Sequence, residues 1–331
     1  MQKKKNNGRF LKRFAYNGGQ RPDAVAEDTT PGIKRYFKLL GRRFWQLVSL
    51  NLMMLFQVLP LLLIVYMWVT LDKTPTASTQ IFAPLYGASL IGATTEGTLL
   101  LDLFGAQVMI PVFTPTAYIL MGISALFLLV TFGWQNVGAT YVLRSMVRGD
   151  PVFLWQDYFY AIRRNLKQGF LLGLLDAAVI FLLVTDYAFF YARLGTFWMD
   201  FMFYAICAMA ILYFFMRFYL YLMLITFDLS IRKLLKNALI FTTLGIKRNL
   251  LATLWILLIT ALNVSLIIVL MPSIVIPLVL PFLYYLAFTA FTSAYAAYPV
   301  IERYMITPYQ KNEEEESEEA PSEEQPSTEA E

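Results

Sequence analysis

Residues 201–227 read FMFYAICAMAILYFFMRFYLYLMLITF, and Arg217 is the only charged side chain among them. An α-helix rises about 1.5 Å per residue, so about 20 apolar residues cross the roughly 30 Å hydrocarbon core of a membrane. Five other stretches are comparably long and apolar. The six stretches are Trp45–Leu71, Ile119–Leu143, Phe170–Tyr191, Phe201–Phe227, Leu250–Met271 and Leu278–Pro299. They predict an all-α membrane protein with six transmembrane helices.

The basic residues between these stretches fall on alternate sides of the predicted membrane. Of the 27 Lys and Arg residues, 24 lie before the first stretch, after the second, after the fourth or after the sixth. Two lie in the other connections, and Arg217 lies inside a span. Because basic residues accumulate in cytoplasmic loops, we expect a multi-pass protein of the plasma membrane with both termini in the cytoplasm. Its expected partner there is the anionic inner leaflet of the lipid bilayer.

Charge and hydropathy divide the chain into three parts. We expect residues 1–44 to form a cytoplasmic basic arm with an amphipathic helix, and residues 45–309 to form the six-helix membrane domain. That domain has one long outer connection, an extracytoplasmic insertion at about 72–118. Residues 310–331 hold ten Glu and no aromatic side chain, which predicts a disordered acidic tail.

A basic amphipathic segment precedes the first, third and fifth stretch. This pattern predicts three helical hairpins, each with an interfacial helix on its cytoplasmic side. Thr30–Pro31 is expected to open the first of these helices, and Asp150 to cap the second with Pro151 at its first position. The segment Ile162–Leu166 (IRRNL) recurs 84 residues later as Ile246–Leu250 (IKRNL). The alternative is that this match is a coincidence. Any membrane protein with basic cytoplasmic loops tends to have a basic pair before a span that begins on the cytoplasmic side.

Composition excludes several kinds of chemistry. The chain has no His, and its single cysteine is Cys207. No His/Cys zinc site, His-based triad or intrachain disulfide is therefore available. Enzymes that use carboxylates or lysine stay formally open, but we expect no enzymatic activity, no metal or other cofactor, and no nucleic-acid partner.

Two ionisable side chains lie deep inside the predicted spans. Asp176 lies about two turns from the cytoplasmic end of the third span and Arg217 about three turns from that of the fourth. A charge pair between them is within reach, and an unpaired charge there would cost several kcal/mol. The alternatives are an Arg217 that snorkels to water and an Asp176 that couples proton or ion movement.

Uncharged polar side chains form a second group of candidates within the spans. Such groups usually form hydrogen bonds between helices, and the alternative is a binding site for a solute. The candidates are Gln135, Asn136 and Asn263, with Gly133 and Gly138 placed to allow a close helix approach or a cavity.

A third group of candidates comprises cations of the interfacial segments. Each is expected to contribute about 1 kcal/mol of attraction to an anionic leaflet, or to dock a partner. They are Arg42, Arg43, Arg163, Arg164, Lys167, Lys247 and Arg248.

Four segments around the second and third stretches form a recognisable signature: Gly138–Arg144 (GATYVLR), Arg148–Asp150 (RGD), Trp155–Tyr158 (WQDY) and Arg164–Gly169 (RNLKQG). Together with Arg43–Leu47 (RFWQL), they resemble the core signature of the YesL-like family. That is a family of bacterial multi-pass membrane proteins defined as a domain of unknown function. The resemblance covers most of 31–71 and 133–250 and stops at the insertion.

The resemblance implies an accessory or regulatory component of carbohydrate uptake, with a sugar transporter of the ATP-binding-cassette type as its partner. The alternative is a small-solute permease, or a membrane-embedded substrate-binding subunit, in its own right. A cavity at the membrane midplane lined by several polar groups would favour that alternative. The oligomeric state stays open.

Overall fold

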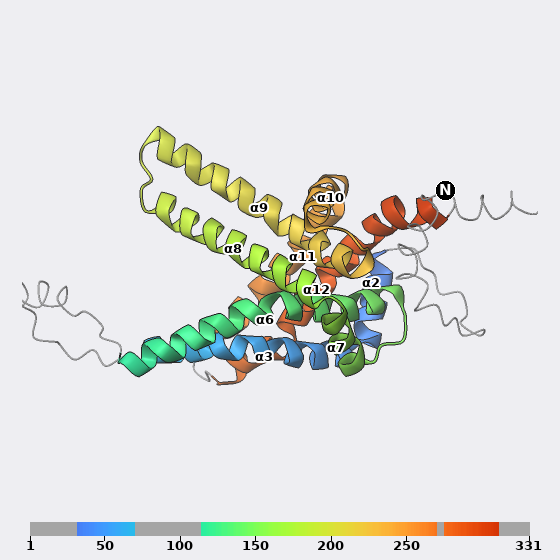
Figure 1. The fold of residues 1–331 in the computed structure, drawn as a ribbon, viewed down its shortest axis with the longest axis horizontal. Coiled ribbons are helices and arrows are strands. Elements are labelled where there is room, and N and C mark those ends of the chain that lie inside the picture. The colour runs from blue at the N-terminus through green and yellow to red at the C-terminus, as the bar shows by residue number, and fades with distance from the viewer. Residues whose placement is uncertain (1–31, 70–113, 270–274, 311–331) are drawn as a thin grey trace, which may run out of the picture. The chain divides into compact units, whose positions relative to one another are not determined.

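The computed structural model describes residues 32–69, 114–269 and 275–310, and within these ranges it contains helices and no strand (Figure 1). The expected all-α fold is thereby confirmed for the described residues. Residues 1–31 of the basic arm, almost all of the insertion and the acidic tail lie outside them. The helices are α2 (Ile33–Arg42), α3 (Phe44–Val69), α6 (Pro115–Arg148), α7 (Leu154–Arg164), α8 (Leu166–Tyr191), α9 (Phe197–Thr226), α10 (Ile231–Leu244), α11 (Ile246–Val269), α12 (Val275–Ile301) and a short π-helix, η2 (Glu302–Ile306).

Five of these helices are long and apolar enough to cross a membrane, as expected of a multi-pass membrane protein. The five stretches are Phe44–Met67, Pro115–Arg148, Leu166–Tyr191, Phe197–Thr226 and Ile246–Val269. The chain divides into two compact units, residues 57–128 and the remainder. In the smaller unit the described parts of α3 and α6 expose mostly apolar side chains. The features described below lie in the larger unit.

The distribution of side chains suits a lipid environment. Long helices such as α11 expose Leu251, Leu254 and Leu258, whereas Asn51 and Asp176 are fully buried. A water-soluble protein rarely exposes such extensive apolar surface. Buried polar groups require hydrogen-bond partners, and these two side chains have them.

The C-terminal half of α9 forms the centre of the larger unit. Residues Phe218–Thr226 are all buried, and α9 packs against α8, α10 and α12. In Figure 1 α8 and α9 run along each other, and the short connection at 192–196 joins them. The N-terminal half of α9 is largely exposed. Its exposed side chains are mostly apolar, as expected of a helix that faces lipid.

Each amphipathic helix continues into the long helix that follows it through a single non-helical residue. These residues are Arg43 (φ −103°, ψ 11°), Asn165 (φ −118°, ψ 23°) and Gly245 (φ −93°, ψ 9°). Each donates its N–H to the carbonyl four residues earlier and accepts the N–H four residues later, at 2.7–3.2 Å. Each junction residue therefore keeps both of its backbone hydrogen bonds although it lies outside the helices.

The sequence repeat does not coincide with these three structural junctions. The IRRNL and IKRNL segments are 84 residues apart, whereas the junctions at Asn165 and Gly245 are 80 positions apart. The difference of four residues is about one helical turn. Consequently Arg163 and Arg164 end α7, whereas Lys247 and Arg248 lie in the first turn of α11. The structure therefore contains three pairs of a short helix followed by a long one, α2–α3, α7–α8 and α10–α11. The repeated sequence segments, however, occupy different positions in the second and third pairs.

The expected start of α7 at Asp150 is wrong. Gly149 has φ +88°, the left-handed conformation that favours glycine. Its N–H donates to Met146 O at 3.1 Å, and the Asp150 N–H donates to Ser145 O at 3.0 Å. This pair of bonds is a Schellman motif, which ends α6. The sequence Arg148-Gly149-Asp150 therefore terminates one helix, and α7 begins only at Leu154.

Helices α6 and α8 make backbone contact through glycine. A Cβ on Gly133 would lie 2.8 Å from Gly173 Cα and closer still to Gly169 O, and a Cβ on Gly173 would collide with Gly133 Cα. Small residues spaced by four permit such close crossings of membrane helices. The expected close approach at Gly133 is therefore present, and it brings Asp176 of α8 near the centre of the unit.

Candidate functional site

A buried carboxylate joins α8 to α9. The side chain of Asp176 is fully buried, and Arg217 Nε lies 3.1 Å from its Oδ1 and 3.2 Å from its Oδ2. The two residues expected to pair from their depth in the spans do form an ion pair. An ion buried without such a partner would cost several kcal/mol.

Two tyrosines that the sequence analysis did not single out complete this cluster. Tyr213 donates its hydroxyl to Asp176 Oδ1 at 2.7 Å, and Tyr221 donates to Oδ2 at 2.9 Å. Tyr213, Arg217 and Tyr221 are spaced by four along α9, so one helix face presents three donors to one carboxylate. This spacing of four around Arg217 is the sequence feature from which the two tyrosines could have been predicted. The described partners of this carboxylate, two phenols and one guanidinium, all donate hydrogen bonds to it.

Arg217 also lines a cavity of about 360 Å³ in the larger unit, between α3, α6, α9, α11 and α12. Its side chain retains 32% exposure although its partner Asp176 has none. The cavity wall combines aromatic and polar side chains. Its polar members are Asn136, Thr140, Arg217, Tyr221, Tyr285, Thr289 and Ser293, and its aromatic faces include Phe214 and Phe218.

The intramembrane amides divide between helix packing and this cavity. Gln135 donates to Met54 O at 2.6 Å, which connects α6 to α3. Asn263 accepts the Tyr284 hydroxyl at 2.8 Å, which connects α11 to α12. Asn136 donates to Phe132 O of its own helix at 2.8 Å and contributes to the cavity wall. Among the three, only Asn136 lines the cavity.

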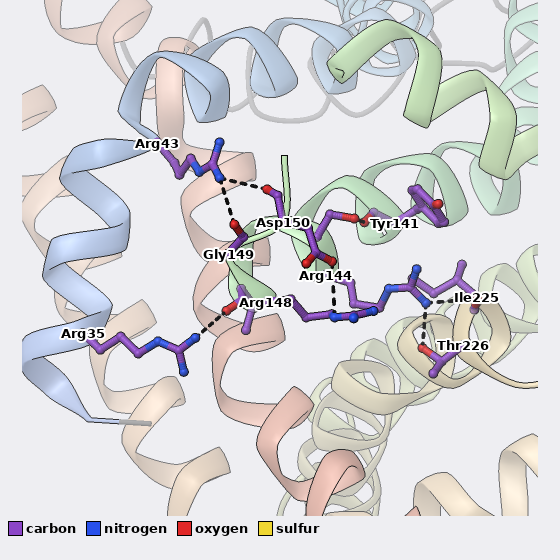
Figure 2. A network of polar contacts seen from close by, with 11 residues as sticks. Arg35, Arg43, Tyr141, Arg144, Arg148, Gly149, Asp150, Ile225 and Thr226 are labelled. Atoms are coloured by element: carbon purple, nitrogen blue, oxygen red, sulfur yellow. Dashed lines mark hydrogen bonds and ion pairs between the residues drawn. The ribbon is translucent and has the colours of Figure 1, made fainter. Parts of the chain in front are cut away.

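Arginines bind backbone carbonyls where α6 and α9 end (Figure 2). Arg35 Nη2 donates to Val147 O at 3.2 Å, and Arg43 Nη2 donates to Asp150 O at 2.8 Å. Arg144 Nη1 donates to Ile225 O and to Thr226 Oγ1, both at 3.3 Å. The last carbonyls of a helix have no partner within it and carry partial negative charge. Arg35 and Arg144 therefore cap the ends of α6 and α9, whereas Arg43 binds the turn that follows α6.

Two further contacts lie in this cluster, one at the turn after α6 and one within α6. Arg148 pairs with Asp150 at 3.3 Å, and the Arg144 guanidinium lies 4.8 Å from the Tyr141 ring centre. Arg144 is almost fully buried. In Figure 2 the side chains of Arg35 and Arg43 approach this turn from one side, whereas the side chain of Arg144 points away from it, toward Ile225 and Thr226.

The cations proposed for membrane or partner docking differ in their surroundings. Arg43 is half-buried and donates hydrogen bonds to the carbonyls of Gly149 and Asp150. Arg164 donates to the Tyr160 hydroxyl at 2.9 Å and remains exposed. Arg248 is half-buried. The other four, Arg42, Arg163, Lys167 and Lys247, are exposed.

No protein-family model matches this chain, and neither a curated protein nor a solved structure shows significant similarity to it.

Proposed function

We propose that this chain is a six-span plasma-membrane protein that binds a small polar solute in the cavity beside Arg217, as part of carbohydrate uptake. Both termini face the cytoplasm, and the spans form three hairpins, each introduced by an interfacial helix. The sixth span is α12, whose 27 residues carry no charged side chain. The basic residues of the connections support the orientation.

The polar wall of the cavity carries this proposal. Binding sites for small molecules usually measure about 300–1,000 Å³ and combine apolar walls with a few polar groups, and the cavity of about 360 Å³ falls in this range. The guanidinium of Arg217, the amide of Asn136 and several hydroxyls are suited to a polyhydroxylated solute. The ion pair through Nε anchors Arg217 beside the cavity.

The chain's context in sugar uptake rests on its resemblance to the YesL-like family, so mono- and disaccharides are the first probes. Full-length protein in lipid nanodiscs would be titrated with a panel of these sugars by isothermal calorimetry. Thr289→Val and Asn136→Leu are expected to weaken binding at least tenfold. Thr253→Val is the matched control, because Thr253 bonds a carbonyl of its own helix, as Thr289 does, but does not line the cavity. Equal effects of Thr253→Val and Thr289→Val would contradict the assignment.

An accessory role without a binding site is the second candidate. The interfacial helices favour it, because α7 exposes Trp155, Phe159 and Arg163, a combination suited to a partner at the membrane surface. The partner implied by the resemblance is a sugar transporter of the ATP-binding-cassette type. This role predicts that deletion of the gene impairs oligosaccharide uptake only when that transporter is present. Sugar flux through proteoliposomes that contain this chain alone would instead establish a permease.

A further inference from the structure

A second hollow of the larger unit is an apolar groove of about 450 Å³ between α2, α11 and α12. Its walls include Phe37 of α2 and Leu251, Leu254 and Leu258 of α11. Among the residues that the structure describes, its lining contains no acidic side chain and one charged side chain, Arg248. The groove therefore combines a long apolar wall with one cation.

The groove is held open by hydrogen bonds between its three helices. Tyr36 shares a hydrogen bond with Thr292 Oγ1 at 2.9 Å and accepts the indole N–H of Trp255 at 3.1 Å. The Tyr295 hydroxyl donates to Gly32 O at 2.7 Å. These contacts fix α2 against α11 and α12 independently of any ligand, so the groove is preformed.

We infer that this groove binds one anionic phospholipid, with an acyl chain along α11 and the phosphate on Arg248. Arg248 lies in the first turn of α11 and forms no ion pair with a described residue. Leu258 is ten residues further along the helix, which at about 1.5 Å per residue is roughly 15 Å, half of a hydrocarbon core of about 30 Å. The groove therefore matches one lipid leaflet in length.

Charge and hydropathy favour a lipid over segments of the chain itself. The N-terminal arm is basic, and the cation at Arg248 would repel it. The tail carries ten Glu and could meet Arg248, but it has no apolar run to fill the wall formed by the leucines. A phospholipid supplies both an anion and an acyl chain.

The test is native mass spectrometry of the full chain, delipidated in detergent and titrated with phosphatidylglycerol or phosphatidylcholine of identical acyl chains. We expect the wild type to bind phosphatidylglycerol at least tenfold more tightly. Arg248→Gln should abolish this preference and Arg248→Lys should keep most of it. Lys247→Gln, an equal loss of charge at the adjacent exposed position, should change it by less than about threefold.

Equal losses in Arg248→Gln and Lys247→Gln would overturn the proposal, because they would indicate general surface attraction. Equal binding of the two lipids by the wild type would do the same.

Replacement of Glu313–Glu316 by Gln in the full chain tests the tail, and a tenfold gain in phosphatidylglycerol binding would identify the tail as the occupant. A photoreactive phosphatidylglycerol should label residues 251–258 of the wild type, and the folded Arg248→Gln variant should lose this labelling.

Discussion

Loss of Arg217 and loss of the Asp176 charge are expected to destabilise the protein by different amounts. Arg217→Gln leaves a fully buried carboxylate with two phenol donors and no cation. Asp176→Asn leaves a cation whose side chain is 32% exposed and which lines a cavity. The remaining cation can be hydrated, whereas the remaining carboxylate cannot. Arg217→Gln should therefore be the more damaging change.

The magnitudes follow from the burial of each partner. Removal of one member of a buried ion pair costs about 3–5 kcal/mol, and we place Arg217→Gln in this range because Asp176 is fully buried. For Asp176→Asn we expect about 1–2 kcal/mol, less than the full cost of a lost charge-assisted bond, since Arg217 gains water. The double variant removes both charges, so its cost should fall at least about 1 kcal/mol below the sum of the single costs.

Equilibrium unfolding with sodium dodecyl sulfate in mixed micelles measures these differences through the fluorescence of the six tryptophans. Asp186→Asn on α8 and Arg193→Gln just beyond its end are the matched controls, expected within about 0.5 kcal/mol of wild type. The reasoning fails if Asp176→Asn costs as much as Arg217→Gln, or if the two losses are strictly additive.

Three further changes test the packing and the helix ends by the same unfolding measurement. Gly173→Ala places a Cβ against Gly133 and should cost about 1–3 kcal/mol, whereas Gly122→Ala meets no atom within 4 Å and should be neutral or stabilise by up to about 1 kcal/mol. Arg144→Gln removes a cap from α9 and should cost about 1–3 kcal/mol; an unchanged stability would refute the capping role. Burial raises the pKa of Asp157 in spite of a backbone hydrogen bond, so ionisation opposes folding as pH rises. Asp157→Asn should therefore stabilise slightly at pH 7, and the gain should vanish as pH falls toward the ordinary Asp pKa of about 3.9.

The spanning helices could be predicted from hydropathy, but their ends could not. The second stretch was expected to end at Leu143, whereas α6 continues to Arg148. Hydropathy reports only the apolar part of a helix, and the polar last turn of α6 is stabilised by caps from distant residues. The Gly149 turn was visible in the sequence, yet Asp150 and Pro151 suggested a helix start at the place where the chain ends one.

The ion pair could be predicted because a charge inside a membrane requires a partner and few candidates exist. The two tyrosines around Asp176 were missed because the chain has 20 tyrosines, and only the spacing of four around Arg217 distinguishes Tyr213 and Tyr221. The cavity could not be predicted at all. Its wall combines side chains from five helices, and the register between those helices depends on contacts between distant segments, such as the hydrogen bond from Gln135 to Met54 O.

Several of the residues that carry the resemblance lie at helix ends or in the turn after α6. Arg144 binds a carbonyl at the end of α9, and Arg43 binds a carbonyl of the turn after α6. Gly149 forms that turn, and Asp150 pairs with Arg148. Of the residues named for the resemblance, only Thr140 and Leu143 line the cavity. Most of its polar wall comes from α9 and α12 instead, through Arg217, Tyr221, Tyr285, Thr289 and Ser293. Under the proposed function, the choice of solute would therefore depend on this wall rather than on the residues of the resemblance. Substitutions in the α9 and α12 wall, such as those of Thr289 or Ser293, are the ones expected to change which solute binds.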